Sequence, residues 1–434
     1  MTTSSNDVHG IVVVGAGAAG LWAAQSAAKL LRASSRDVDV LLLEKTPRSG
    51  TKVLASGGTR CNLTTTLDPQ RAAQLFGKAG SRFLRTAFRT LTPTDVRTQF
   101  DEWGVPSVEA PLDKVFPESG NARHVRDALQ KACTDSGVVT RHDVSVRGVH
   151  REKDHWRVVL EDGETIGAKR LLLCPGGKSY PLTGTTGDGY EWLRELELEL
   201  VAGVPALVPL LSPASWVHAL TGLSAQNATV RLRNEDGKAL MDRTRPVLFT
   251  HRGLSGPGPM DVSRFVAQAV TKASQGAWPT PVKFVVEIDL MPQCTHEDLT
   301  EQLRFAATRT GSPLISKLFS DDLPRRLVEA ACVSVDLPAD IRTNVLPKAG
   351  RHKLVTALKG LSVPISGTAS FDEAEVTAGG LALSELDPGS MRVRKYEDLF
   401  VFGEVIDLDG PIGGLNFQSA FATAELAARA AVKP

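Results

Sequence analysis

The sequence contains few cysteines and no long apolar run. Its five cysteines are scattered, odd in number and without a CxxC pair, which is typical of free thiols in a reducing compartment. Neither HExxH nor a paired His/Cys spacing occurs, so no structural metal is expected. No apolar stretch approaches the length of a membrane span, and the polar start MTTSSNDVHG lacks the apolar segment of a signal peptide. These absences predict a cytoplasmic protein with no membrane partner.

An excess of charge is missing as well. Lys and Arg number 50, Asp and Glu number 49, and the formal net charge is +1. Such a balance excludes a global field that would attract nucleic acid or anionic lipid, but it leaves a local basic patch open. We therefore expect a small-molecule substrate and no nucleic-acid partner. The length of 434 residues suits two or three domains, and it does not determine the oligomeric state.

The strongest motif is the stretch 11–20, IVVVGAGAAG. Its four leading apolar residues predict a buried strand, and the Ala-rich stretch 21–31 predicts a helix after a glycine turn. This order is typical of the phosphate-binding start of a dinucleotide-binding unit. Gly15 would permit the tight turn, Gly17 would let the backbone approach a pyrophosphate, and Gly20 would let helix and strand pack closely.

An acidic residue follows at the position that such a unit needs. The apolar stretch 38–43 predicts a second strand, and it ends at Glu44. A carboxylate at this point holds a ribose hydroxyl, and its charge disfavours a 2′-phosphate. The alternative is a glycine turn in an unrelated α/β protein with Glu44 merely solvated. The order of strand, turn, helix, strand and acid favours the dinucleotide site.

A long loop rich in small residues, 45–62, comes next. Lys52 and Arg60 lie among its Gly and Ser residues, which predicts a track along an extended ligand, and FAD is long enough to need one. An ordinary surface loop is the alternative. Cys61 has no second cysteine nearby, since the next is Cys133, so a dithiol relay is not expected. We expect Cys61 to be a small packing residue.

The middle of the chain predicts further strands and helices. Helices are expected at 81–90, 123–132 and 295–360, a hairpin at 155–166, and strands at 137–149, 169–174, 225–233, 246–250, 282–290 and 374–383. Thr295 and Asp298 have the spacing of a capping box. His251 and Arg252 lie in a polar, glycine-rich loop and are candidate substrate-facing residues. A structural or solvated pair is the alternative.

A second strand, glycine turn and helix lies near the C-terminus. The strand 399–402 leads to Gly403 and Glu404, and Gly413 and Gly414 then precede an Ala-rich helix that ends near residue 432. Two such helix starts on one parallel sheet would hold the two ends of one FAD. The second helix would point its dipole at the flavin and favour the charge that develops on reduction. An unliganded helix start is the alternative.

Together these motifs resemble the BaiN-like flavoproteins, which are also labelled NAD(P)/FAD-dependent or aminoacetone-oxidase-family FAD-binding enzymes. The matching segments are VVVGAGAAGLWAA, SGGTRCN, GGKSYPLTGTTGDGY, FTHRGLSGPGPMDVS, EVTAGG and FGEVIDLDGPIGGLNFQSAFATA. The resemblance implies an α/β fold in three parts. These are a Rossmann-like FAD-binding domain (1–200 and 365–434), an inserted β-barrel-like domain (201–294 and about 345–364) and a small helical domain (295–344).

The resemblance also implies FAD contacts from both chain ends: Gly15, Gly17, Gly20, Glu44, Lys52, Ser56, Gly57, Gly58, Arg60, Asn62, Gly403, Glu404, Gly414, Asn416 and Phe417. Neighbours in these regions complete the expected cofactor-binding set: Ala16, Ala18, Ala19, Lys45, Cys61, Val144, Gly176 and Gly413. One departure is visible, because Thr59 stands where the family has a third glycine. Its Cβ and hydroxyl would narrow that contact.

The function expected from these features is an FAD-dependent oxidoreductase. It would transfer a hydride between flavin N5 and a small organic substrate, with NAD(P)H as a donor that binds transiently, because the chain has no second GxGxxG domain. The alternatives are a flavin-dependent amine oxidase that uses dioxygen, a flavin-containing RNA-modifying protein, and a flavin-binding protein without turnover. No residue stands out as a catalytic acid, base or nucleophile, which a flavin enzyme does not require.

Overall fold

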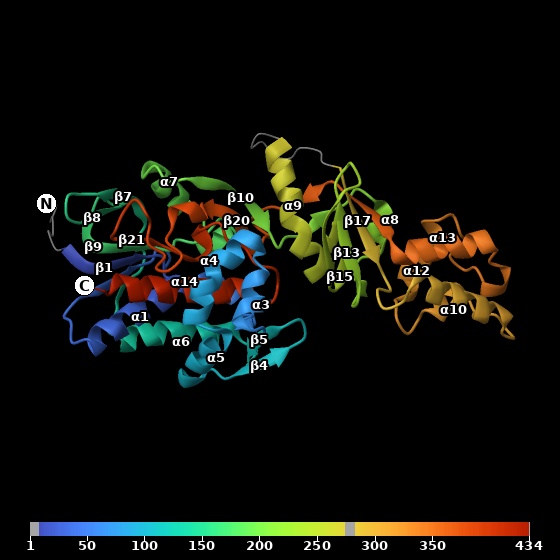
Figure 1. The fold of residues 1–434 in the computed structure, drawn as a ribbon, viewed down its shortest axis with the longest axis horizontal. Coiled ribbons are helices and arrows are strands. Elements are labelled where there is room, and N and C mark those ends of the chain that lie inside the picture. Colours follow the sequence, from blue (N-terminus) through green and yellow to red (C-terminus); the bar gives the residue numbers. More distant parts are fainter. Residues whose placement is uncertain (1–7, 274–282, 434) are drawn as a thin grey trace. The chain divides into compact units, whose positions relative to one another are not determined.

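The computed structural model describes residues 8–273 and 283–433. The chain forms two compact units, which Figure 1 draws as ribbons. Unit 1 comprises Met1–Gly203 and Glu375–Pro434, and unit 2 comprises Val204–Ala374. Among the described residues, no helix combines the length and apolar character needed to cross a membrane.

A seven-stranded sheet with a parallel core organises unit 1. Its main order is β6-β2-β1-β9-β8-β7, and β21 pairs with the C-terminal part of β9. The strands are β1 (Val8–Val14), β2 (Val40–Leu43), β6 (Val139–Arg141), β7 (Val146–Arg151), β8 (Trp156–Leu160), β9 (Thr165–Leu173) and β21 (Leu399–Val401). Strands β1, β2, β6, β9 and β21 are parallel. The apolar runs of β1, β2, β9 and β21 are buried, which is typical of a parallel sheet, whereas Val139 of β6 is exposed.

Helices and smaller sheets complete unit 1. The helices are α1 (Ala18–Ala33), α2 (Thr51–Ala55), α3 (Pro69–Gln74), α4 (Gly77–Thr90), α5 (Pro93–Glu102), α6 (Ala122–Asp135), α7 (Asp188–Glu195) and α14 (Leu415–Ala431), with short 3-10 turns at Pro181–Thr183, Leu383–Glu385 and Gly403–Val405. Strands β3 (Thr64–Thr65), β5 (Lys114–Pro117) and β4 (Ser107–Ala110) form one small sheet. Strands β10 (Leu200–Ala206) and β20 (Val376–Leu381) form another.

Helices α1 and α14 lie side by side and run in the same direction (Figure 1). The Trp22 ring packs on the Phe421 ring with 4.9 Å between centroids. Four residues further along each helix, the Ser26 hydroxyl donates to Glu425 Oε2 at 2.8 Å. The Trp22 indole N–H donates to the same oxygen at 3.0 Å. Since the contacts advance in the same order along both helices, both N-termini lie at the same end of unit 1.

Unit 2 contains two antiparallel sheets and several helices. One sheet has the order β12-β15-β16-β11-β19 and the other β14-β13-β17-β18. The strands are β11 (Leu210–Leu211), β12 (Ser224–Ala225), β13 (Thr229–Arg233), β14 (Ala239–Thr244), β15 (Val247–Thr250), β16 (Gly253–Ser255), β17 (Phe284–Asp289), β18 (Leu361–Ile365) and β19 (Gly367–Thr368). The helices are α8 (Ser215–Ala219), α9 (Pro257–Ala273), α10 (His296–Thr308), α11 (Ile315–Leu318), α12 (Arg325–Val333) and α13 (Lys348–Lys359), with a 3-10 turn at Thr343–Val345.

Several local predictions are confirmed. Helix α10 begins after the expected capping box, in which the Asp298 N–H donates to the Thr295 hydroxyl at 3.1 Å and the Thr295 N–H donates to the Asp298 carboxylate at 2.8 Å. The hairpin expected at 155–166 is present as β8 and the start of β9. The strand expected at 282–290 corresponds to β17, and its first residue, Val282, lies outside the described residues.

One predicted strand differs from the structure, and two segments near the expected domain bounds can be placed. The strand expected over 137–149 is two strands, β6 and β7, because Asp143 between them has a left-handed φ of 57° that breaks an extended chain. Residues 348–359 form α13, which packs on α10 and α12, as the helices expected over 295–360 predict, although the three-part division gave them to the β-barrel-like domain. Residues 365–374, assigned to the FAD-binding domain, lie in unit 2, where β19 pairs with β11. The division into three domains stays a prediction.

Candidate cofactor site

The glycine turn after β1 is shaped by two close approaches of the backbone. Gly15 has a φ of 102°, and a Cβ there would lie 2.5 Å from the Cys174 carbonyl oxygen. A Cβ on Gly20 would lie 1.8 Å from the Gly15 carbonyl oxygen. Neither position can hold a side chain, which confirms the tight turn and the close helix packing. Gly17 is different, because a Cβ there would meet no atom within 4 Å. Packing within the protein does not explain Gly17.

Helices α1 and α14 begin without a side-chain cap, as α2, α4 and α7 of unit 1 also do. Gly17 is the N-cap of α1 and Gly414 is the N-cap of α14, and neither first turn contains an acidic residue. Each N-terminus therefore presents unsatisfied N–H groups and a partial positive charge. Gly403, in the turn after β21, would place a Cβ 3.0 Å from the Ala19 Cβ, so this turn lies against the start of α1.

The C-terminal glycine turn also requires glycine. Gly414 has a φ of 79°, and a Cβ there would lie 1.9 Å from the Thr64 carbonyl oxygen. Gly413 has a φ of 142°. Asn416 holds the turn from inside, because its side-chain oxygen accepts from the Gly410 N–H and its side-chain NH₂ donates to the Gly410 carbonyl, both at 2.8 Å. Phe417 packs on Phe421 with 5.8 Å between ring centroids. These contacts fix the conformation of the glycine turn at the N-terminus of α14.

Glu44 joins the first glycine turn to the loop that follows β2. Its Oε2 accepts from the Ala16 N–H at 2.9 Å, and its Oε1 accepts from the N–H of Thr46 at 2.9 Å and from the Thr46 hydroxyl at 2.7 Å. The Val144 N–H donates to the Glu44 carbonyl at 2.9 Å. A carboxylate has about four acceptor positions, so these bonds leave room for a ribose hydroxyl. The ribose contact stays a prediction.

Lys45 bridges two segments of unit 1 that are far apart in sequence. Its ammonium group lies 2.6 Å from the Thr186 hydroxyl and 2.6 Å from Asp188 Oδ2 at the start of α7. Burial raises the pKa of Asp188, but hydrogen bonds from Lys45 and Thr186 outweigh it and hold the pKa below its ordinary value. Gly176, after β9, lies against Thr185, since a Cβ there would be 2.8 Å from its Cγ2.

A second ion pair unites three distant segments. Lys52 Nζ lies 2.5 Å from Glu404 Oε2, and the Thr377 N–H donates to Glu404 Oε1 at 2.9 Å. The Lys52 and Glu404 side chains are 24% and 21% exposed, so both remain accessible to a ligand. The predicted cofactor residues Lys52 and Glu404 therefore meet in the fold, although 352 positions separate them in the chain.

Tyr190 is a residue that the sequence analysis missed. Its side chain is buried, and its hydroxyl has no hydrogen-bond partner among the described residues. Burial raises the pKa of Tyr190, and the nearby carboxylates of Glu404 and Asp407 raise it further. Lys178 Nζ lies 5.6 Å from the centre of the Tyr190 ring. Tyr190 ends the segment GGKSYPLTGTTGDGY, but nothing in that segment indicates that the hydroxyl lies near Glu404.

Several residues of the 56–62 loop have a left-handed backbone conformation. Gly57, Gly58, Thr59 and Cys61 all have φ between 56° and 68°. Thr59, at 68°, is β-branched, and such residues strongly disfavour this conformation. Cys61 is fully buried, as a packing residue is, and burial raises the pKa of its thiol to about 12, which disfavours the thiolate.

The polar side chains of this loop are bound to the protein. The Ser56 hydroxyl donates to the Val53 carbonyl at 2.6 Å. The Arg60 guanidinium lies 4.4 Å from the Phe116 ring centre, and Asn62 accepts from the Val115 N–H at 3.2 Å. These contacts anchor the loop to β5 and α2. Contacts of Ser56, Arg60 and Asn62 with FAD stay predictions.

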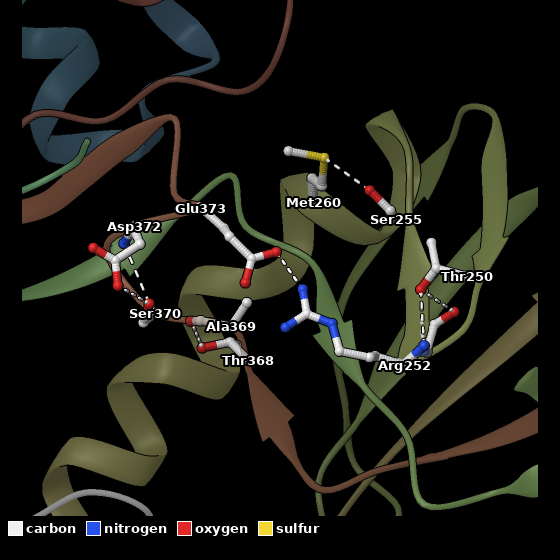
Figure 2. A network of polar contacts seen from close by, with 10 residues as sticks. Thr250, Arg252, Ser255, Met260, Thr368, Ala369, Ser370, Asp372 and Glu373 are labelled. Atoms are coloured by element: carbon white, nitrogen blue, oxygen red, sulfur yellow. Dashed lines mark hydrogen bonds and ion pairs between the residues drawn. The ribbon is translucent and has the colours of Figure 1, made fainter. Parts of the chain in front are cut away.

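The candidate substrate residues His251 and Arg252 lie in unit 2, between β15 and β16 (Figure 2). Figure 2 shows the Arg252 guanidinium directed at the Glu373 carboxylate, with which it forms an ion pair. The Arg252 N–H also donates to the Thr250 hydroxyl at 3.4 Å. The structure therefore gives Arg252 a partner within unit 2, as the structural alternative expects. His251 is exposed, and the substrate-facing role of both residues stays a prediction.

The geometry of unit 1 fits FAD. The parallel sheet places two uncapped, non-acidic helix N-termini at one end, and the space at Gly17 is open to an approaching group. This fold and site define an FAD-binding oxidoreductase. The chain belongs to the family described as HI0933-like protein Rossmann domain, whose model matches residues 9–430. This membership confirms the flavoprotein resemblance.

Characterised proteins similar to this chain carry two kinds of name. It is 29% identical over 413 residues to the ribosomal RNA dihydrouridine synthase of Escherichia coli (strain K12). This alignment covers 95% of each of the two chains. It is 27% identical over 427 residues to the 3-dehydro-bile acid delta(4,6)-reductase of Clostridium scindens, covering 98% of this chain and 99% of that protein. Its fold is similar to 3-ketosteroid-delta4-(5alpha)-dehydrogenase from Rhodococcus jostii RHA1, with a TM-score of 0.51, 15% identity and coverage of 100% and 99%.

Proposed function

We propose that this protein is an FAD-dependent reductase of a carbon–carbon double bond conjugated to a carbonyl, and that its substrate is uridine in ribosomal RNA. The two named activities of its relatives share this chemistry. Dihydrouridine forms when the C5=C6 bond, conjugated to the C4 carbonyl, gains a hydride and a proton. A delta-4 double bond beside a 3-oxo group is conjugated in the same way. A second relative, from Haemophilus influenzae and 28% identical over 417 residues, also carries the ribosomal RNA name.

The observation that carries the proposal is the parallel pairing of α1 and α14. When bound, FAD supplies the hydride. The α1 N-terminus and the open space at Gly17 would receive the pyrophosphate. The α14 N-terminus would stabilise negative charge on the reduced ring. Both roles require the two N-termini to lie at one end of unit 1, as the Trp22 and Ser26 contacts with α14 place them.

The polar group around Glu404 would orient the bound ligand. Lys52 neutralises the Glu404 carboxylate, and the Thr377 N–H fixes its second oxygen. Tyr190 is protonated at neutral pH, as an ordinary tyrosine is, and burial and the carboxylates of Glu404 and Asp407 raise its pKa further. A neutral hydroxyl without a protein partner in the described chain is a hydrogen-bond donor for a bound group.

This proposal changes the expected substrate from a small molecule to RNA. The earlier expectation rested on the net charge of +1, which averages over the chain and says nothing about a local patch. Reduced nicotinamide remains the proposed electron donor. An amine oxidase is less favoured, because neither kind of name among the relatives above is that of an oxidase.

The test is anaerobic reduction of the purified flavoprotein by NADH or NADPH, followed by mixing with unmodified ribosomal RNA transcripts. We expect flavin bleaching by the donor, then its reoxidation by RNA with dihydrouridine in the product. A 3-oxo-4-ene steroid serves as the small-molecule arm. Reoxidation by the steroid alone would overturn the RNA substrate. Fast reoxidation by dioxygen in the presence of an amine substrate would instead favour the oxidase.

A further inference from the structure

Helix α4 carries a row of cations on one face. Lys78, Arg82, Arg85 and Arg89 are all exposed. Their spacing of four, three and four residues places them within a sector of about 60° around the helix axis, over a length of about 16 Å. The opposite face is apolar and buried, with Phe83, Leu84, Ala87 and Phe88 in the core of unit 1. Figure 1 shows α4 beside α3 in unit 1.

The charged residues of this segment all have one sign, as they do in only a few stretches of the chain, such as 341–371. Residues 69–94 contain five Lys or Arg and no Asp or Glu, although the whole chain is balanced. The acidic residues that bound the segment are engaged, since Asp68 caps α3 and Asp95 forms the capping box of α5. A helix face that is merely solvated mixes both signs, and like charges four residues apart destabilise a helix. The four cations of α4 form no ion pair or hydrogen bond with any described residue.

We propose that this row, Lys78, Arg82, Arg85 and Arg89, binds the phosphate backbone of the RNA substrate. This inference rests on the proposed function, and it assigns the surface that holds the RNA. Phosphates repeat along a strand, and a straight row of unpaired cations can contact several of them in succession. Arg suits this role because its planar guanidinium binds phosphate through two N–H groups. Such contacts bind without reading the base sequence.

The helix does not have the features of a membrane-binding helix. An interfacial helix inserts an exposed apolar face into the bilayer. The apolar face of α4 instead packs inside unit 1, where a Cβ on Gly80 would lie 3.0 Å from Leu408 and 2.8 Å from Phe76. Only the cationic side is left to meet a partner, which favours a polyanion in solution.

The test compares two double variants with the same change in net charge. Arg82→Gln with Arg85→Gln removes the centre of the row. Arg123→Gln with Lys131→Gln removes two exposed cations from α6 and serves as the matched control. We expect the α4 variant to bind ribosomal RNA about tenfold more weakly, with a salt dependence shallower by about 1.4 in log–log slope. The control should bind as the wild type does.

The outcomes separate the two proposals. Reduction of the bound flavin by NAD(P)H or dithionite should be equal in all three proteins, and thermal melting should show that the α4 variant folds. If the wild type reduces RNA and the α4 variant binds it equally well, the surface is wrong and the proposed function stands. If the wild type neither binds nor reduces RNA, the proposed function fails. If the wild type binds phosphatidylglycerol vesicles but not RNA, and the α4 variant loses the vesicle binding, the row binds a membrane and the RNA surface is overturned.

Discussion

Gly20 lies so close to the carbonyl oxygen of Gly15 that a Cβ at position 20 would stand 1.8 Å from it. The start of α1 is thereby pressed against the end of β1. Gly17, between them, has open space where its Cβ would be. Packing therefore requires glycine at position 20 and not at position 17, where we propose that the space receives a ligand.

This difference predicts opposite phenotypes for two alanine variants. Gly20→Ala should destabilise the apoprotein by about 3 kcal/mol, because backbone must move to admit the methyl group. Gly17→Ala should leave the unfolding free energy of the apoprotein nearly unchanged and weaken FAD binding, and Gly17→Val should abolish flavin retention. Urea unfolding of apoprotein and FAD titration measure the two effects. Full FAD occupancy in Gly17→Val would refute the pyrophosphate placement.

Thr59 occupies a left-handed conformation that glycine adopts without strain. We expect Thr59→Gly to raise the unfolding free energy by up to about 1 kcal/mol, since strain relief exceeds the entropy that glycine adds to the unfolded chain. FAD should also bind more tightly. Thr59→Ala is the control, because it retains a Cβ and should gain little. Equal stability in the two variants would show that the Cβ is not strained.

The Lys45 and Asp188 pair predicts a pH dependence. The pKa of Asp188 is below its ordinary value of 3.8 in the folded protein, where Lys45 and Thr186 outweigh the effect of burial. A depressed pKa contributes stability above the unfolded value, and this contribution is lost as the pH falls through the folded pKa. Lys45→Met should therefore lower the urea midpoint at pH 7 and have little effect near pH 2. A constant difference at both pH values would contradict the pairing.

Thiol reactivity should follow burial. Cys61, Cys133, Cys174 and Cys332 are buried, and Cys294 is half-buried. Burial raises the pKa of each of these thiols, to about 12 for Cys61 and Cys133 and about 11 for Cys332. We expect a disulfide reagent at pH 8 to label Cys294 first in the native protein and all five cysteines in denaturant. Rapid native labelling of Cys61, found by peptide mapping, would show that its loop opens.

Tyr190→Phe isolates the buried hydroxyl. Because that hydroxyl has no partner among the described residues, its removal should leave the stability of the apoprotein unchanged or raise it by up to about 1 kcal/mol. If the hydroxyl donates to a bound group, flavin absorbance or turnover should change while melting does not. A loss of apoprotein stability would instead assign the hydroxyl a structural contact. Trp192→Phe, on the same helix, is the contrasting variant: it removes the hydrogen bond from the indole N–H to the Arg147 carbonyl and should lower the stability of the apoprotein.

Local backbone features could be predicted from neighbouring residues. Gly15 has the left-handed φ of a tight turn, Gly20 is constrained by the Gly15 carbonyl five residues away, and Thr295 and Asp298 form a cap within one helical turn. The apolar run of β1 indicates a strand buried on both faces. These features depend on short-range sterics and hydrogen bonds, which a sequence pattern records directly.

Contacts between segments that are far apart in the sequence could not be predicted and are known only from the folded structure. The meeting of Lys52 with Glu404, the position of Tyr190 beside that carboxylate and the parallel pairing of α1 with α14 join residues hundreds of positions apart. No periodicity encodes such pairings, because they arise when the sheet brings separate strand ends to one edge. The basic face of α4 lies between these cases. The spacing of its four cations can be read from the sequence, but only the folded structure shows that the apolar side is buried and the cations are exposed.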